Sequence, residues 1–568
     1  MLKGFFSLTF FLLAFFLKLF LLIPPGQAQP AEMIRVSISS PKSFNPVVAR
    51  ETSTTEITDK MFVGLTRTDG KTGEVIPELA SEWTSSANGR IWEFKLREDL
   101  KWSDGEPLTA ADVEFTYNRL YLNFDIPTSS RFILLQEGQA PEVEKISERR
   151  IKFEYPEPYA PLPRAAGLGI MPRHVLEEEV EAGDFETVWG VDAEPDSIVV
   201  NGPFRLENYI SAQRVFLERN PNYYREADDG TSLPRLDRLI YDIVRNRELA
   251  LQQFINGQVD VLNLQGEDFP VLKPIEEERD FTIHRLGPSM GTTFLAFNMN
   301  TDSDPETGEP YLSEPRRSWF NDSEFRRAVS YGLDRQSMVD IALNGLGTPQ
   351  RGPVSRSNEF FHNPDLQVDS YDPERAKRIL RENGYKYRDG DRYRSDSEGN
   401  KISINLITHS ENEQRLVTAQ IIRSDLEDLG FDVNFNQVEF NTLVNKLSAE
   451  MNWEAVVIGF TGSLDPHFGR NVWLSSGDLH LWHPHQSSPA REWEAEIDDI
   501  FEEAAREVDR EERRRLYNRW QEIVERKRPV IYTANPDVIY AVRNRFTHVE
   551  PTVLGGIDHN IDEIGVKR

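Results

Sequence analysis

The chain has 568 residues, of which 39% are hydrophobic and 11% aromatic, with no cysteine and a formal net charge of −29. This length exceeds what one hydrophobic core supports, so we expect two or three globular domains. The absence of cysteine excludes disulfides, thiolate metal sites and thiol nucleophiles. The negative charge argues against nucleic acid as a partner, because the phosphates would be repelled.

The N-terminal segment is far more apolar than the rest of the chain. A lysine at position 3 precedes a mostly apolar run over residues 4–23, which one further lysine interrupts, and Pro24-Pro25-Gly26-Gln27-Ala28 follows. A charged start, an apolar middle and a small residue before the break predict a secretory signal peptide over residues 1–28. An uncleaved anchor is the alternative, because the run approaches the length of a membrane span. We therefore expect a secreted protein.

The stretch Pro77–Leu120 predicts a strand pair, a turn and a helix within one compact lobe. Three tryptophans lie in it, and Thr109 with Asp112 forms an imperfect capping box at the expected helix start. Alternating or helical spacing of apolar residues defines the predicted elements in this part of the chain. They are a strand at Ile34–Ser39, a helix at Thr52–Leu65 and a strand at Ile91–Leu96.

The segment Gly64–Thr72 superficially resembles a phosphate-binding loop. That motif needs four residues between its glycines, whereas five stand here, with Asp69 where the second glycine belongs. An acid at that position would repel phosphate. We therefore interpret Asp69-Gly70 as a hairpin turn.

The remainder of the chain continues the alternation of strands and helices that is typical of α/β lobes. Asn201-Gly202-Pro203 breaks the chain before a predicted hairpin. The other predicted elements are strands at Thr292–Phe297, Ile402–Thr408, Phe431–Val438, Ala455–Ile458 and Pro529–Thr533, and helices at Glu248–Ile255, Ser323–Leu343, Asp372–Asn383, Glu411–Leu429 and Arg491–Arg526.

The segment Phe460–Trp473 (FTGSLDPHFGRNVW) is the strongest candidate for a ligand site. It follows a predicted buried strand, so it begins where that strand emerges at a lobe edge. It combines glycines, a carboxylate, a hydroxyl, a cation and aromatic rings, which is the mixture that a cleft for a small zwitterion needs. An ordinary surface loop is the alternative interpretation.

Four of the ten histidines lie between residues 467 and 485. His467, His480, His483 and His485 could surround a metal ion. However, no helix or strand pattern places them on one face, and Pro484 forces a kink. We therefore predict a cleft or surface loop and no metal site, with these histidines as the weaker alternative.

Several blocks of the sequence resemble the family 5 extracellular solute-binding proteins of peptide and nickel importers. In chain order they lie in Pro77–Leu120, Asn201–Tyr224, Phe325–Gly347 and Tyr371–Tyr385. Their order and separation match the family over nearly the whole mature chain. The resemblance implies an α/β periplasmic-binding-protein fold of the second type, with two lobes joined by a hinge and an extra inserted domain.

Following the family, we assign three domains. Domain I takes residues 29–65, 200–290 and 535–568, the inserted domain II takes residues 66–199, and domain III takes residues 291–534. The same resemblance implies a periplasmic protein whose lobes close around a solute and deliver it to the permease and ATPase of an ABC importer. We expect a monomer.

The candidate site departs from the family pattern at Ser463. In peptide-binding members, an aspartate at this place pairs with the α-ammonium of the peptide, and loss of one partner of a desolvated charge pair typically costs about 2–5 kcal/mol. Either Asp465 takes the ligand cation in place of that aspartate, or the ligand is not a conventional peptide. Arg470 would take a ligand carboxylate. The full set of predicted ligand-binding residues is Asn45, Thr54, Phe460, Gly462, Ser463, Asp465, Arg470 and Trp473.

We expect a binding protein for a peptide or other small zwitterionic solute, with no cofactor and no catalytic residue. The first alternative is capture of a metal chelate or other cationic solute, because nickel-type members also carry an Asp-Pro-His, as Asp465-Pro466-His467 does here. A secreted hydrolase is the second alternative, although no nucleophile and base stand out as a pair.

Overall fold

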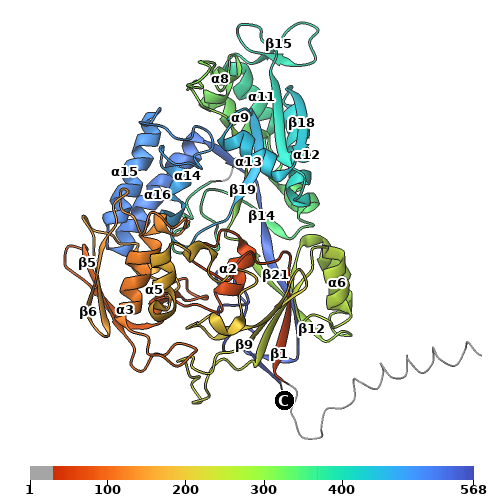
Figure 1. The fold of residues 1–568 in the computed structure, drawn as a ribbon. Helices are drawn as coiled ribbons and strands as arrows, with labels where there is room; N and C mark the ends of the chain where they lie inside the picture. Colours follow the sequence, from red (N-terminus) through yellow and green to blue (C-terminus); the bar gives the residue numbers. More distant parts are fainter. Residues whose placement is uncertain (1–29, 368, 568) are drawn as a thin grey trace, which may run out of the picture.

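The computed structural model of the protein describes residues 30–367 and 369–567 (Figure 1). The predicted signal peptide and its cleavage site lie outside these residues. Within them, no helix is both long enough and apolar enough to cross a bilayer. The strands form three sheets of four or more strands, and three two-stranded ribbons accompany them.

The largest sheet joins segments from both ends of the chain. Its central strand β1 (Glu32–Ser37) pairs in parallel with β10 (Arg238–Ile243) and β11 (Val261–Leu264). The strand order is β12 (Phe281–Pro288), β21 (Ala534–Arg543), β11, β1, β10, β9 (Arg214–Arg219) and β8 (Phe204–Ile210), with β14 (Gly347–Pro349) beside β21. The helices α2 (Thr52–Thr58) and α6 (Arg247–Ile255) belong to the same part of the chain.

The second sheet confirms the interpretation of Pro77–Leu120. Strand β5 occupies Ile91–Leu96, and its Phe94 and Leu96 are buried. Thr109 and Asp112 cap α3 (Ala110–Phe115) reciprocally. The sheet has the order β4 (Ala80–Ser85), β5, β7 (Arg150–Glu154) and β6 (Glu142–Ser147). The ribbon β2 (Thr66–Thr68) with β3 (Val75–Pro77) and the helices α4 (Leu162–Ala165) and α5 (Arg173–Ala182) complete this part.

The third sheet carries the predicted candidate loop at the end of its middle strand. Its order is β18 (Asp432–Val438), β17 (Ser403–His409), β19 (Ala455–Phe460), β13 (Thr292–Phe297) and β20 (Val530–Tyr532). Figure 1 shows the helices of this part around the sheet. They include α8 (Arg316–Asn321), α9 (Ser323–Gly332), α11 (Pro373–Glu382), α12 (Glu413–Asp428), α13 (Phe440–Ser448), α14 (Arg470–Trp473), α15 (Glu492–Arg506) and α16 (Arg510–Lys527).

Two predicted helices end earlier than the sequence pattern indicated, and a third, over Arg491–Arg526, is divided into α15 and α16. The prediction of one helix over Ser323–Leu343 is wrong, because α9 ends at Gly332 and Leu333 is extended. Asp334 then caps a separate short turn by accepting from the backbone N–H of Ser337. The prediction of a helix over Thr52–Leu65 is also too long, because α2 ends at Thr58. The apolar residues beyond Thr58 keep a helical spacing in the sequence although they lie outside the helix.

Two crossings join the first and third sheets side by side. One runs from β12 to β13 through residues 289–291, and the other from β20 to β21 through Thr533. The backbone N–H of Ser289 donates to the Pro536 carbonyl, and that of Thr533 to the Thr293 carbonyl. These paired crossings are where a hinge between lobes would bend. The predicted domain limits stay a prediction, and β14 of the predicted domain III joins the first sheet.

Candidate functional site

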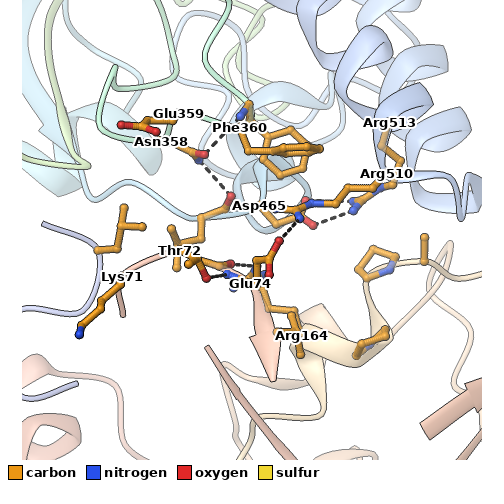
Figure 2. A pocket seen from close by; sticks show the side chains of 18 of the residues that line it. Lys71, Thr72, Glu74, Arg164, Asn358, Glu359, Phe360, Asp465, Arg510 and Arg513 are labelled. Carbon is orange, nitrogen blue, oxygen red and sulfur yellow. Dashed lines mark hydrogen bonds and ion pairs between the residues drawn. The ribbon is translucent and has the colours of Figure 1, made fainter. Parts of the chain in front are cut away.

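A cavity of about 770 Å³ lies between the part of the chain that holds the second sheet and the part that holds the third sheet. We call it the charged cavity, and Figure 2 shows most of the side chains that line it. It has the size of a small-molecule site. It is lined by residues 71–75, 83, 92, 160, 161, 163, 164, 286, 357–361, 464, 465, 508, 510, 513 and 552–554.

Three pairs of opposite charges line or reach this cavity. Arg513 forms a bidentate pair with Asp465, at 2.8 and 3.0 Å. Arg510 Nη1 lies 2.8 Å from Glu74 Oε1, and its guanidinium lies over the ring of Phe360. Lys71 pairs with a glutamate of the C-terminal segment. These six side chains therefore neutralise one another before any ligand binds.

Arg164 is the cation of the cavity that has no opposing charge. Its Nη1 donates to Thr68 Oγ1 at 2.7 Å and its Nη2 to the Gly73 carbonyl at 2.6 Å. Among the described residues, no carboxylate oxygen lies within 4.0 Å of it. Burial lowers the pKa of the half-buried guanidinium, with Asp465 partly opposing that effect. An arginine stays charged at neutral pH even when burial lowers its pKa, so Arg164 offers a positive charge to a ligand.

Glu359 is the corresponding anion. It is exposed on the loop that precedes Phe360 and forms no ion pair within the described part of the chain. The neighbouring Asn358 fixes this loop, because its Nδ2 donates to the Leu464 carbonyl at 3.0 Å. The charged cavity therefore presents one cation and one anion that have no counter-charge among the residues that the structure describes.

Asp465 lies in the charged cavity, but both of its carboxylate oxygens are occupied. Besides the pair with Arg513, its Oδ1 accepts from the backbone N–H of His467 at 3.0 Å. Burial disfavours the carboxylate, yet Arg513 outweighs burial and lowers the pKa of Asp465. The predicted role of Asp465 as the ligand of a cation stays a prediction, since the side chain is already neutralised.

Ser463 and Arg470 serve contacts inside the protein. Ser463 Oγ donates to the Asp465 carbonyl at 2.7 Å. Arg470 Nη2 donates to the carbonyls of Phe132 and Leu135 at 2.6 and 2.9 Å, and its guanidinium lies over the Phe132 ring. Arg470 thus fastens the candidate loop to the part that holds the second sheet, and its predicted role toward a ligand carboxylate stays untested.

The remaining predicted residues do not line the charged cavity. Phe460, Gly462 and Trp473 line a cavity of about 70 Å³, and Trp473 packs against Trp482 and Trp520. Phe460 and Gly462 also line a cavity of about 720 Å³ beside the crossings between the first and third sheets. A Cβ on Gly462 would lie 1.8 Å from the Met290 carbonyl oxygen, which explains glycine there.

The two residues predicted from the facing lobe are also buried. Asn45 Nδ2 donates to the Phe185 carbonyl at 3.2 Å. Thr54 Oγ1 donates to Glu51 and accepts from the backbone N–H of Lys42. Both side chains shape the loop before α2, and neither lines the charged cavity.

The four clustered histidines each have a separate partner. His467 Nε2 lies 3.0 Å from Arg470 Nη1 and 3.2 Å from the Tyr159 hydroxyl. Burial and Arg470 lower the pKa of His467 well below its usual range, so the ring is neutral. His480 lies near Glu494, His483 near Asp302, and His485 near Asp478. In residues 30–367 and 369–567, no group of three potential metal ligands occurs.

Sequence reasoning missed the two free charges. Arg164 follows the proline-rich segment Tyr155–Pro163, whose four prolines indicate an irregular crossing and give no sign of a ligand contact. Glu359 lies in a polar loop between predicted elements. The only available signal was a lone charged residue near prolines or aromatic rings, and such residues are common on surfaces.

The comparisons with known proteins agree with this architecture. The model of the bacterial extracellular solute-binding proteins, family 5 Middle, matches residues 74–480, which is more than half of the chain. A probable ABC transporter-binding protein of Deinococcus radiodurans is 27% identical over 549 residues, covering 92% of this chain and 90% of that protein. The oligopeptide-binding protein AppA of Bacillus subtilis is 24% identical, covering 90% of this chain and 87% of AppA.

Solved structures show the same fold. AppA of Bacillus subtilis in complex with a nonapeptide superposes with a TM-score of 0.72 at 23% identity, covering 95% of this chain and 100% of that one. NikZ of Campylobacter jejuni in complex with Ni(L-His) gives a TM-score of 0.72 at 20% identity, covering 94% and 99%. The expected α/β periplasmic-binding-protein fold is confirmed. The chain therefore belongs to the bacterial extracellular solute-binding proteins of family 5, as a solute-binding protein of an ABC transporter and not an enzyme.

Proposed function

We propose that this protein captures a peptide-like zwitterion in the charged cavity and delivers it to the permease of its ABC importer. The observation that carries the proposal is the pair of uncompensated charges there. Arg164 would bind the carboxylate of the solute and Glu359 its ammonium group. A zwitterion satisfies both groups at once.

The other lining residues favour the same class of ligand. Phe360 and Trp92 supply apolar surface, while the three internal ion pairs hold the walls without consuming Arg164 or Glu359. A volume of about 770 Å³ accommodates a peptide of a few residues. The complex of AppA with a nonapeptide shows that this fold serves peptides in a relative.

Lobe closure would follow from differential affinity. A solute that contacts both Arg164, beside the second sheet, and Glu359, on a loop of the opposite wall, binds the closed arrangement more tightly than an open one. The closed state would then be the one presented to the permease. Binding at micromolar dissociation constants requires about −8 kcal/mol, which two charged contacts with apolar burial can supply.

Calorimetric titration with short peptides tests the proposal. Arg164→Gln should weaken binding about tenfold to a hundredfold, because a hydrogen-bonded charged contact contributes about 1.5–3 kcal/mol. Amidation of the peptide C-terminus should cause a similar loss in the wild type and no further loss in Arg164→Gln. N-acetylation of the peptide and Glu359→Gln should form a second such pair. Each change alone should weaken binding, and the two together should cause no further loss.

The controls use exposed residues outside the cavity. Arg149→Gln and Glu98→Gln disrupt a surface ion pair and should leave the affinity unchanged. If amidation and Arg164→Gln weaken binding additively, the carboxylate does not lie on Arg164. Retention of a metal complex after purification, with no peptide bound, would instead favour the metal-chelate alternative.

A further inference from the structure

A buried histidine lies where the part of the chain that holds the second sheet meets the part that holds the third sheet. We call this contact the joint, and it consists of Phe132, Leu135 and Tyr159 on one side and of His467 and Arg470 on the other. The Tyr159 hydroxyl lies 3.2 Å from His467 Nε2, and the two rings meet edge to face with their centroids 5.5 Å apart. His467 is 1% exposed. Its ring is therefore enclosed by both sides of the joint.

The contacts of His467 admit only the neutral imidazole ring. Arg470 Nη1 lies 3.0 Å from His467 Nε2, and a guanidinium offers only N–H donors, so Nε2 must present its lone pair. Among the described residues, the other ring nitrogen, Nδ1, is buried without a hydrogen-bond partner. A second proton on the ring would remove the acceptor of Arg470 and would place two positive charges side by side.

The charged groups around His467 also oppose a positive ring. Arg513 of α16 adds a second cation nearby, and the neighbouring carboxylate of Asp465 already pairs with Arg513. Tyr159 supplies no negative charge, because burial raises the pKa of its hydroxyl far above neutral pH. Burial, followed by Arg470, lowers the pKa of His467 well below its usual range.

Arg470 connects the histidine to the opposite side of the joint. Its Nη2 donates to the carbonyls of Phe132 and Leu135 at 2.6 and 2.9 Å, so displacement of Arg470 by a protonated ring would weaken these bonds as well. Opening of the joint would expose His467 to water, where a histidine has a pKa of about 6.5. The ring therefore takes up a proton more readily in the open joint than in the closed one.

We propose that His467 makes the joint a pH-sensitive latch, which closes with a neutral ring and opens when the ring is protonated. Above about pH 6.5 the ring is neutral in both forms, so pH has no effect on closure. Below that value the open form binds the proton, and each further pH unit lowers the ratio of closed to open molecules by up to about tenfold. Acid would therefore favour the open form even without a solute.

Fluorescence energy transfer across the joint tests the proposal in the ligand-free mature protein. Because the chain has no cysteine, two introduced thiols carry the dyes without competition. Glu142→Cys on β6 and Glu503→Cys on α15 are suitable, since both glutamates are exposed and belong to opposite sides of the joint. Opening moves the two sides apart, so the transfer efficiency should fall as the pH is lowered from about 7.5 to about 5.0.

Two variants in the labelled background remove the titration. His467→Gln keeps an acceptor for Arg470 and takes up no proton in this range, so its transfer efficiency should stay constant. His467→Met fills a similar space without an ionisable group, and its efficiency should also be independent of pH, whatever its closed fraction at neutral pH. Circular dichroism at each pH verifies that the proteins remain folded. His174→Gln is the matched control, because His174 is exposed and lies 2.8 Å from Asp104, and this variant should respond to acid as the wild type does.

Three outcomes would overturn the inference. They are a constant efficiency in the wild type, an acid response in the His467 variants equal to that of the wild type, and a loss of the response in His174→Gln. No peptide enters any of these measurements. The latch and the proposed solute site can therefore fail separately.

Discussion

At the scale of single residues, the buried pair of Asp465 and Arg513 governs the candidate loop. Both side chains are more than nine-tenths buried, and two hydrogen bonds join them. A buried charge is costly without its partner, whereas a complete pair is nearly neutral in stability. Asp465 therefore shapes the loop by pairing with a cation that the protein itself supplies, and in the proposed function the ligand contacts fall to Arg164 and Glu359.

Removing one member of this pair should destabilise the protein strongly. Asp465→Asn leaves the Arg513 charge buried and uncompensated, which costs about 3–5 kcal/mol in free energy of unfolding. The double variant with Arg513→Met should recover a large part of that loss. Urea unfolding at neutral pH measures both. A double variant no more stable than Asp465→Asn would show that the pair contributes through packing and not through charge.

At the scale of elements, the turn between α15 and α16 shows that a capping residue sets a helix boundary which the spacing of apolar residues does not reveal. The sequence predicted one charged helix over Arg491–Arg526, and that prediction is wrong at residues 507–509. Asp509 accepts from the backbone N–H groups of Glu511 and Glu512 at 2.8 and 3.0 Å and starts a new helix. The turn swings α16 back along α15, which brings Arg510 and Arg513 into the charged cavity.

Loss of this cap should cost a modest amount of stability. Asp509→Ala removes the acceptor for two terminal N–H groups, and we expect a loss of about 1 kcal/mol. Asp509→Asn keeps an acceptor and should be nearly neutral. Urea unfolding of the two variants provides the measurement. Equal losses in both would mean that the carboxylate charge, and not the cap, stabilises the turn.

At the scale of the whole molecule, contacts beside the charged cavity join the parts of the chain that hold the second and third sheets. Arg470 reaches the carbonyls of Phe132 and Leu135, and the backbone N–H of Ala160 donates to the Ala505 carbonyl. The described structure is therefore closed at this edge. These contacts lie beside the charged cavity, so their strength would contribute to the balance between open and closed forms.

Arg470→Met should shift that balance toward the open form. The variant keeps apolar bulk over Phe132 but loses hydrogen bonds worth about 1–3 kcal/mol in the closed state. Small-angle X-ray scattering should give a larger radius of gyration for the ligand-free variant, and saturating peptide should restore the wild-type value. An unchanged radius without ligand would show that other contacts suffice for closure.

The sequence by itself determined the family, the α/β class and most strands. These features depend on the spacing of apolar residues and on turn residues, which can be recognised within short stretches such as Ile91–Leu96. It also indicated the loop after β19 as a place of interest. Only the tertiary structure decided which charges are free. Asp465 is neutralised by a residue 48 positions away, and Arg164 is left alone by the absence of any nearby carboxylate in the described residues. Charge pairing depends on distances in space, and sequence spacing does not encode them.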